Sequence, residues 1–284
     1  MAEQAESRKM RLLEHLAAAE GGEDLDDLAA AMRCDARTVR RDLESLQELL
    51  RRVQGIELQR GRVVVSRPGF SPGYFTDQLD RHAEAKERIA RAIVARLEDG
   101  TAVALTAGST PFAVAREIRR AGMEGDGPRN LIVFTNSVPA LLELVSAGVS
   151  TGALGEIYAA EDCAFHSPEL RSAFQPEVAI VGASGVLFGP AGAQQTLELF
   201  SHRAEEAAFL KQLLAGVPEI VVAADSSKLG RRHPWSFGGD SLAGKRVRIV
   251  TEALTDEQRA DLSALSAHLA EAGTVLEYEA APGD

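Results

Sequence analysis

Hydrophobic and polar positions change their period near residue 66, which divides the chain into two differently patterned parts. In the first part, apolar residues recur at helical spacing over residues 7–20, 25–32 and 36–46, and short β-branched runs follow at 53–58 and 62–65. In the second part, short apolar runs alternate with helical patterns from about residue 83 onward. The pattern therefore predicts three helices with a β-hairpin wing, followed by an α/β domain with a mainly parallel sheet covered by helices.

The second part is expected to contain helices over residues 86–97, 111–120, 138–146 and 203–214 and strands over residues 102–106, 131–134, 178–181, 220–223, 247–250 and 275–278. No element is assigned to residues 152–168. Residues 66–73 are rich in Pro, Gly and Ser and lack periodicity, which is typical of a linker. We therefore expect domains at 1–66 and 83–284, joined by a linker at 67–82.

The third helix of the first part has the features of a DNA recognition helix. Asp35 can cap it, and Val39, Leu43 and Leu46 fall on one face for packing. Asp24 is expected to cap the helix before it, and a tight turn at Arg33-Cys34 joins the two helices. The arginine, threonine and serine side chains of this helix point away from its packing face, so they are available to phosphates and base edges, and the wing adds two arginines. The predicted DNA-binding residues are Arg33, Arg37, Thr38, Arg40, Arg41, Ser45, Arg60 and Arg62. The alternative is the solvated face of a plain three-helix bundle.

Charge and composition restrict the class of protein. The 284 residues carry a net charge of −11, most of it beyond residue 66, which excludes a general nucleic-acid coat protein and confines DNA binding to the first part. Cys34 and Cys163 are too few for a disulfide framework, and the six His show no metal-ligand spacing. No apolar run approaches the length of a membrane span, so a cytoplasmic protein without metal, cofactor or membrane partner is expected.

Small hydroxyl and glycine residues follow four of the expected strands. Because ligands bind beyond the carboxyl ends of parallel strands, these loops are candidate effector-binding sites. In the first loop, a glycine allows close approach and Pro111 opens a helix whose free N–H groups attract an anion such as phosphate, which the ammonium of a lysine could neutralise. The alternative is that these residues are helix caps and turns. The candidates are Ala107, Gly108, Ser109, Thr110, Thr135, Asn136, Ser137, Gly182, Ala183, Ser184, Asp225 and Lys228.

With both parts described, the chain resembles the DeoR-type bacterial transcriptional regulators over nearly its whole length. The family's T-[IV]-R-R-D-L, G-[ST]-T, T-N-S, G-A-S-G and A-D-S-S-K-x-G-R-R motifs occur in family order at residues 38–43, 108–110, 135–137, 182–185 and 224–232. The resemblance implies a winged helix-turn-helix that binds double-stranded operator DNA. It also implies a sensor domain similar to ribose-5-phosphate isomerase, which binds a phosphorylated sugar or related metabolite, in a repressor of sugar or carbon metabolism that forms a dimer or tetramer.

Two other functions remain open at this point. One is a sugar-phosphate isomerase-like enzyme carrying a DNA-binding module, although the acids of the isomerase loop are replaced here by residues 182–185, leaving Glu177, Asp225 and Glu206 as candidate bases. No catalytic residue is therefore expected. The other is a regulator whose sensor domain has lost its ligand and only oligomerises, because Thr106-Ala107 stand where the family often has an Asp before the first loop.

Overall fold

The computed structural model describes residues 12, 22–43, 56–59, 62–65, 75, 78–79, 81–159, 163–167, 175–191 and 194–281. It divides the chain into two compact units, Met1–Pro72 and Gly73–Asp284. Each unit has its own core, because one apolar cluster lies in the first unit and two lie in the second.

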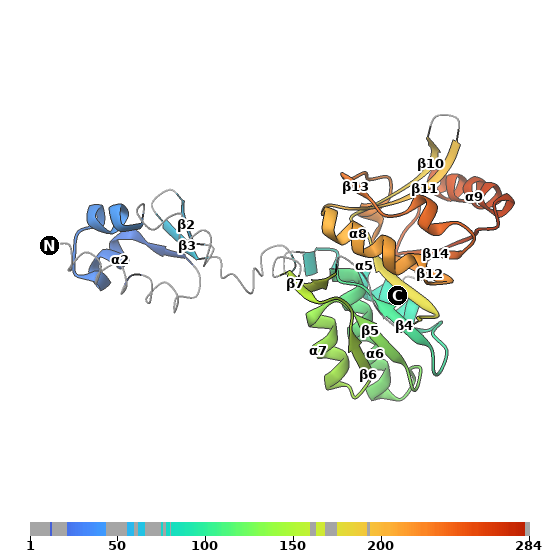
Figure 1. Ribbon diagram of the computed structural model, residues 1–284, viewed down its shortest axis with the longest axis horizontal. Coiled ribbons are helices and arrows are strands. Elements are labelled where there is room, and N and C mark those ends of the chain that lie inside the picture. Colours follow the sequence, from blue (N-terminus) through green and yellow to red (C-terminus); the bar gives the residue numbers. More distant parts are fainter. Residues whose placement is uncertain are drawn as a thin grey trace. The chain divides into compact units, whose positions relative to one another are not determined.

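The N-terminal unit combines helices with a small antiparallel sheet. Strand β1 (Gly22–Asp24) precedes helix α2 (Leu25–Met32), residues 36–43 form the next helix, and β2 (Ile56–Gln59) and β3 (Arg62–Val65) form the hairpin, in the order β1-β3-β2 (Figure 1). The predicted hairpin is confirmed over residues 56–59 and 62–65, and residues 53–55 of its expected first strand lie outside the described residues. The pattern does not predict β1, a short polar segment that becomes a strand only by pairing with β3. The expected helix at 7–20 lies outside the described residues except for Leu12, which is helical and buried.

The turn before the arginine-rich helix follows the sequence prediction. Arg33 adopts a left-handed conformation with φ of 54°, and the Cys34 N–H donates to the Ala29 carbonyl at 3.0 Å. Asp35 then caps the next helix, accepting hydrogen bonds from the backbone N–H of Thr38 at 2.8 Å and from its hydroxyl at 2.9 Å. Asp24, in contrast, occupies the N-cap position of α2, but its side chain accepts no capping hydrogen bond, so that part of the prediction is wrong.

These bonds make the Asp35 cap dependent on pH. The hydrogen bonds from Thr38 lower the pKa of Asp35, so the carboxylate is stabilised in the folded state. Its contribution to folding is present above the unfolded-state pKa and is lost as the pH falls through the folded-state pKa. We expect Asp35→Asn to retain the cap but to lose this part of the acid-induced decrease in stability, measured by denaturant unfolding between neutral and acidic pH. An equal acid dependence in both proteins would contradict the assignment.

The second unit is built on a seven-stranded sheet in the order β15-β14-β12-β9-β4-β5-β6, with every neighbouring pair parallel. Its strands are β4 (Ala102–Leu105), β5 (Ile132–Thr135), β6 (Ser150–Ala153), β9 (Val178–Gly182), β12 (Glu219–Ala223), β14 (Arg246–Thr251) and β15 (Val275–Ala280). The mainly parallel α/β fold predicted from the alternating pattern is therefore confirmed. The six expected strands are all present, and the sheet gains β6 at one edge.

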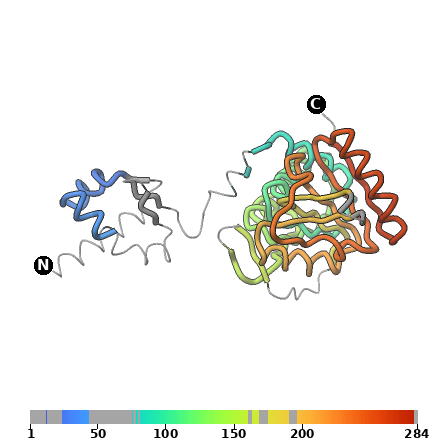
Figure 2. Tube along the Cα trace, turned by 90° about the horizontal axis from the view of Figure 1, so that it is seen from above, coloured from blue at the N-terminus to red at the C-terminus, as the bar shows by residue number. Residues whose placement is uncertain are grey.

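Helices cover both faces of this sheet (Figures 1 and 2). On one face lie α5 (Ala83–Val94), α6 (Ser109–Glu124) and α7 (Val138–Ser146), which pack on buried strand residues such as Val103 and Leu105. On the other face lie α8 (Ala204–Ala215) and α9 (Asp256–Glu271), which pack on the alternate strand residues, such as Ala104. Because alternate strand residues point to opposite faces, burial on both sides explains the continuous apolar runs in the sequence.

Several elements are absent from the sequence prediction. A long antiparallel hairpin, β10 (Gly185–Ala191) and β11 (Gln194–Ser201), joins β13 (Trp235–Ser236), and β7 (Ile157–Ala159) pairs with β8 (Ala164–His166). Helix α9 was also missed, although its capping box at Thr255 and Gln258 is visible in the sequence. Its apolar face is narrow, since only Leu262 and Leu265 are buried, so periodicity gave little indication of a helix.

Gly185 begins the β10–β11 hairpin where no side chain fits. A Cβ there would lie 2.4 Å from the Arg231 carbonyl oxygen, which belongs to the backbone. We expect Gly185→Ala to lower the free energy of unfolding by about 1–3 kcal/mol, measured by denaturant titration. Gly122→Ala is the control, because nothing lies within 4 Å of its Cβ position and alanine should stabilise helix α6 by about 0.5–1 kcal/mol. Equal stability of the Gly185 variant and the wild type would contradict the predicted clash.

Candidate functional site

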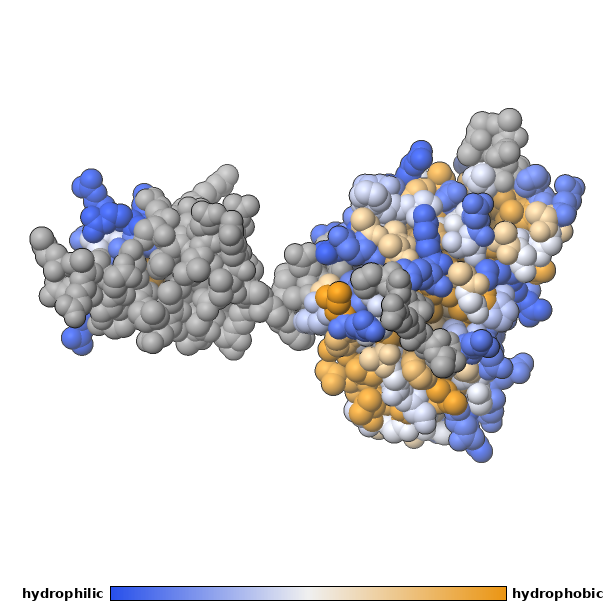
Figure 3. All heavy atoms as spheres, viewed as in Figure 1, coloured by the Kyte–Doolittle hydropathy of each residue, from blue (hydrophilic) through white to orange (hydrophobic). Residues whose placement is uncertain are grey.

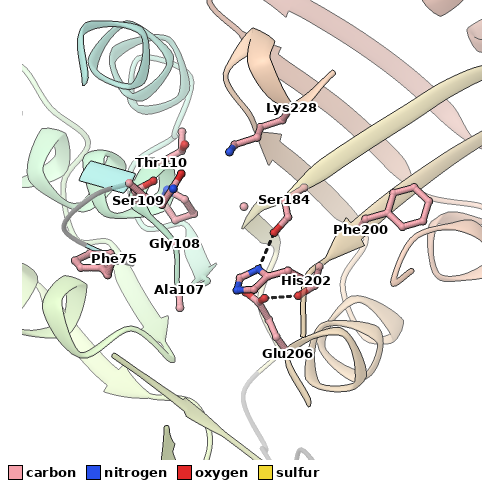
Figure 4. A pocket seen from close by; sticks show the side chains of 15 residues that line it. Phe75, Ala107, Gly108, Ser109, Thr110, Ser184, Phe200, His202, Glu206 and Lys228 are labelled. Carbon is pink, nitrogen blue, oxygen red and sulfur yellow. Dashed lines mark hydrogen bonds between the residues drawn. The ribbon is translucent and has the colours of Figure 1, made fainter. Parts of the chain in front are cut away.

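A cleft lies beyond the carboxyl ends of three neighbouring strands, β4, β9 and β12, where a ligand is expected in an open parallel sheet. The loop after β4 forms one side, and the residues after β9, a short 3-10 turn after β12, the end of β11 and the start of α8 form the other (Figure 4). The lining residues are Phe75, Gln78, Ala107, Gly108, Ser109, Thr110, Pro111, Gly182, Ala183, Ser184, Phe200, Ser201, His202, Glu206 and Lys228.

One end of the cleft is suited to an anion. Gly108, with φ of 130°, is the N-cap of α6, and the N–H of Phe112 is already used by the Gly108 carbonyl. Pro111 has no N–H, so the donors of Ser109 and Thr110 remain in the first turn. Figure 4 shows the half-buried Lys228 extending toward these two residues from the opposite side. A helix N-terminus and an ammonium group therefore face the same space.

The neighbouring cations add to this positive potential. Burial lowers the pKa of His233, and the charges of His202, Lys228 and Arg231 lower it further. Nearby, the Arg232 guanidinium lies 5.9 Å from the centre of the Phe200 ring. Such a concentration of positive charge favours a phosphate dianion over a neutral ligand.

The other end of the cleft carries Ser184, a predicted effector-binding residue, together with three residues that are not among the effector-binding candidates predicted from the sequence: Ser201, His202 and Glu206. The Ser184 hydroxyl and His202 Nδ1 are 3.0 Å apart, and the Ser201 hydroxyl donates to the Glu206 carboxylate (Figure 4). Glu206, which the sequence offers only as a candidate base of an isomerase-like enzyme, lines the cleft. Only residues 202–203 separate β11 from α8, so His202 directly follows a strand, but the sequence pattern does not predict β11 itself.

The structure separates the predicted effector residues into two groups. Eight of them line the cleft: Ala107, Gly108, Ser109, Thr110, Gly182, Ala183, Ser184 and Lys228. The other four are at most 2% exposed and support the cleft from behind: Thr135, Asn136, Ser137 and Asp225. Asn136 accepts the Ala107 N–H at 2.7 Å, Ser137 caps α7 through the Ala140 N–H, and Asp225 accepts the Ser227 N–H at 3.1 Å. These side chains therefore shape the loops.

The predicted DNA-binding residues within the described part of the chain have a consistent placement. Arg33, Arg37, Arg40 and Arg41 are exposed, whereas Val39 and Leu43 are buried in the core of the N-terminal unit. Thr38 is half-buried and bound to Asp35. Ser45 and Arg60 lie outside the described residues, and Arg62 begins β3. The helix therefore presents its arginines to solvent and its apolar residues to the core.

Within the described ranges, no group of three or more His, Cys, Asp or Glu side chains is placed to hold a metal ion. Over the same residues, no helix is long and apolar enough to cross a bilayer.

A compact helix-containing unit with an exposed arginine face, joined to an α/β unit with an anion-suited cleft, has the organisation of a ligand-responsive DNA-binding regulator. Residues 81–244 match the family model described as the DeoR C terminal sensor domain. The chain belongs to the DeoR family of transcriptional regulators.

Individual relatives are similar over most of their length. The L-fucose operon activator of Escherichia coli (strain K12) is 26% identical over 251 residues, 84% of this chain and 90% of the relative. The HTH-type transcriptional regulator GlpR of Haloferax volcanii is 26% identical over 227 residues, 79% of this chain and 82% of the relative. Among solved structures, ribose 5-phosphate isomerase A from Methanocaldococcus jannaschii is 19% identical, covers 52% of this chain and 55% of that chain, and has a TM-score of 0.38.

Proposed function

We propose that this DNA-binding transcriptional regulator controls genes of sugar or carbon metabolism in response to a phosphorylated sugar bound in the cleft of its second unit. The observation that carries this proposal is the half-buried Lys228, which faces the N-terminus of α6 across the cleft. The proposed effector-binding residues are the eight that line the cleft, with Thr135, Asn136, Ser137 and Asp225 holding their loops. The names of two relatives, an L-fucose operon activator and GlpR, support an effector of this metabolic class.

The two ends of the cleft suit the two ends of a sugar phosphate. The phosphate binds between Ser109, Thr110 and Lys228, and the sugar hydroxyls donate to Glu206 and bond to His202. Glu206 thus supplies a carboxylate in place of the Asp that the loop at Thr106-Ala107 lacks. We therefore propose a ligand-binding sensor domain in place of one that only oligomerises, which is supported by the lysine at one end of the cleft and the carboxylate at the other.

DNA binding is proposed for residues 1–66, within the N-terminal unit, through the wing and through the exposed arginines of residues 33–41. Residues 67–82 are the proposed linker, and residues 83–284 are the proposed sensor and oligomerisation domain. A helix-turn-helix reads two half-sites as a dimer, so we propose a cytoplasmic homo-oligomer on double-stranded operator DNA. Helix α7 offers a contact surface between copies, since Leu142 and Val145 are exposed there and Figure 3 shows apolar side chains gathered over this region.

The experiment that tests the proposal is a thermal-shift screen of the full chain against pentose, hexose and triose phosphates, with the unphosphorylated sugars and inorganic phosphate as controls. A ligand at about 100 times its dissociation constant stabilises the folded state by about 2.7 kcal/mol. The sugar phosphate that stabilises the protein is then added to the complex of protein and operator DNA in a mobility-shift titration. If the protein is a repressor, the sugar phosphate should release it from the DNA. A reporter gene distinguishes repression from the activation named for the E. coli relative. No shift with any phosphorylated sugar would overturn the effector assignment.

The isomerase alternative has one observation in its favour, because Glu206 is a carboxylate inside the cleft. Of the other candidate bases, Glu177 accepts the Ala102 N–H at 2.8 Å, at the opposite end of β4, and Asp225 is buried. We propose that Glu206 reads hydroxyls without catalysis and that the protein is not an enzyme and uses no cofactor. Turnover of pentose or hexose phosphates above about 1 per second, followed by NMR, would move the protein into the enzyme class.

The same residue gives a prediction on specificity. Glu206→Gln keeps the shape of the side chain but removes the charge that strengthens hydrogen bonds from hydroxyls, so the affinity for the sugar phosphate should fall about 10-fold or more. Binding of inorganic phosphate should be unchanged or tighter, because a negative charge has been removed. Calorimetric titrations of both ligands measure this difference. An equal loss of affinity for both would place Glu206 outside the hydroxyl-binding end.

A further inference from the structure

Two residues of the cleft come from the segment that leads to the DNA-binding unit. Phe75 and Gln78 line the cleft beside the loop of Gly108 and Pro111. Phe75 also packs edge-on against Phe112 of α6, with ring centroids 5.6 Å apart and planes at 73° (Figure 4 shows its position in the cleft). A ligand in the cleft can therefore contact the loop at the start of α6 and the segment before α5 at once.

A buried lysine fixes this segment to the sensor domain. Lys86, in the first turns of α5, is only 3% exposed, and its ammonium group donates to the carbonyls of Gln78 and Arg81, the latter at 2.6 Å. Burying an ammonium group is costly unless it is hydrogen-bonded, so its position requires these carbonyls to stay in place. Lys86 does not itself line the cleft, because the cleft-lining residues of this region are Phe75 and Gln78.

The position of this segment in the chain gives it a further role. The boundary between the two units falls between Pro72 and Gly73, shortly before Phe75. Of the residues that line the cleft, Phe75 and Gln78 are therefore the nearest in the chain to the DNA-binding unit. A ligand shifts the equilibrium between two conformations of a protein only if it contacts them differently. Phe75 and Gln78 provide such a contact, because they line the cleft and precede α5 on the side of the linker.

We propose that the segment around Phe75 and Gln78, held by Lys86, is the element through which occupancy of the cleft changes operator binding. This inference rests on the proposed effector function, because it concerns how that same site is read. Lys86 is a positioning residue here. It fixes the segment against α5, so that a displacement of Phe75 and Gln78 by the ligand is transmitted to the linker.

The test compares the full-length wild type with Lys86→Met, which keeps the length and apolar stem of the side chain and removes the ammonium donor. In the wild type, the sugar phosphate found in the thermal-shift screen should change the operator dissociation constant by about 5- to 150-fold, the usual range of allosteric coupling. In Lys86→Met this change should fall below about twofold, while the effector affinity without DNA stays within about threefold of the wild-type value. Lys211→Met, at an exposed lysine of α8, is the control and should behave as the wild type.

Reciprocity supplies a readout that a merely structural role of Lys86 would not affect. If coupling is lost, the effector must bind the free and the operator-bound variant equally, whereas it distinguishes the two forms of the wild type. Should Lys86→Met fail to fold, Phe75→Leu and hydrogen exchange of residues 75–82 in the wild type replace it, with reduced coupling and slower exchange on ligand addition expected. Full coupling in Lys86→Met, or in Phe75→Leu with unchanged exchange, overturns the proposal. A wild type that binds no sugar phosphate instead refutes the proposed function.

Discussion

Lys228→Ala is expected to reduce the thermal stabilisation by the effector strongly and to weaken its influence on operator binding. The ammonium group lines the cleft and faces the first turn of α6. A hydrogen bond to a charged partner contributes about 1.5–3 kcal/mol, so losing it should weaken phosphate binding about 10- to 150-fold. Ser109→Ala removes one hydroxyl from the same end of the cleft and should give a smaller loss.

Operator binding without the effector should be nearly unchanged in the Lys228 variant, because the residue belongs to the second unit. Thermal shift and calorimetry measure the effector, and mobility shift measures the operator. Lys211→Ala is the matched control, since this exposed lysine of α8 does not line the cleft. If Lys228→Ala and Ser109→Ala both respond to the effector as the wild type does, the phosphate site is elsewhere.

Arg40→Ala and Arg41→Ala are expected to weaken operator binding by about 1–3 kcal/mol each where a base or desolvated phosphate contact is lost. Both side chains are exposed on the helix that Asp35 caps, whereas the buried Val39 and Leu43 hold that helix in its core. Fluorescence anisotropy over a salt series separates the two kinds of contact. Losing a phosphate contact should reduce the salt slope by about 1, whereas losing a base contact reduces sequence discrimination.

Arg116→Ala is the control for these substitutions, because Arg116 is exposed on α6 of the second unit. Both substitutions are also combined in an Arg40→Ala/Arg41→Ala double variant, and circular dichroism checks that it is folded. A double variant with unchanged affinity and salt slope would show that this helix does not contact the DNA. The arginines would then form only the solvated face of a helix bundle.

Elements with strong local determinants were predicted closely. Helix α7 has the expected bounds, because Ser137 caps it and a proline stands in its first turn. Strands β9, β12 and β14 lie where the sequence has apolar runs, since strands buried on both faces need no alternation. The Asp35 cap and the Arg33-Cys34 turn also depend on neighbours within a few residues, so the sequence contained the information.

Elements that depend on distant partners were missed. Strand β1 exists through pairing with β3, and β11 through pairing with β10 and β13. The far wall of the cleft, with His202 and Glu206, comes from the end of β11 and the start of α8 and was missed with them. The motif at Thr135–Ser137 shows the reverse case. Its residue types suit a ligand site, but Asn136 is hydrogen-bonded to the loop at Ala107, and Thr135 and Ser137 are hydrogen-bonded within the turn before α7.

Helical and strand periodicity, caps and turns act over short distances, so four features could be predicted without a structure: the two-part organisation, the arginine helix, the parallel α/β class and the glycine and hydroxyl loops. The folded chain was needed to show which of those loops border one cleft, that Glu206 and His202 complete it, and that the segment of Phe75 and Gln78 forms part of its wall. The physical reason is that a cleft is made where separate elements pack together, and the packing of residues far apart in the chain has no counterpart in local spacing.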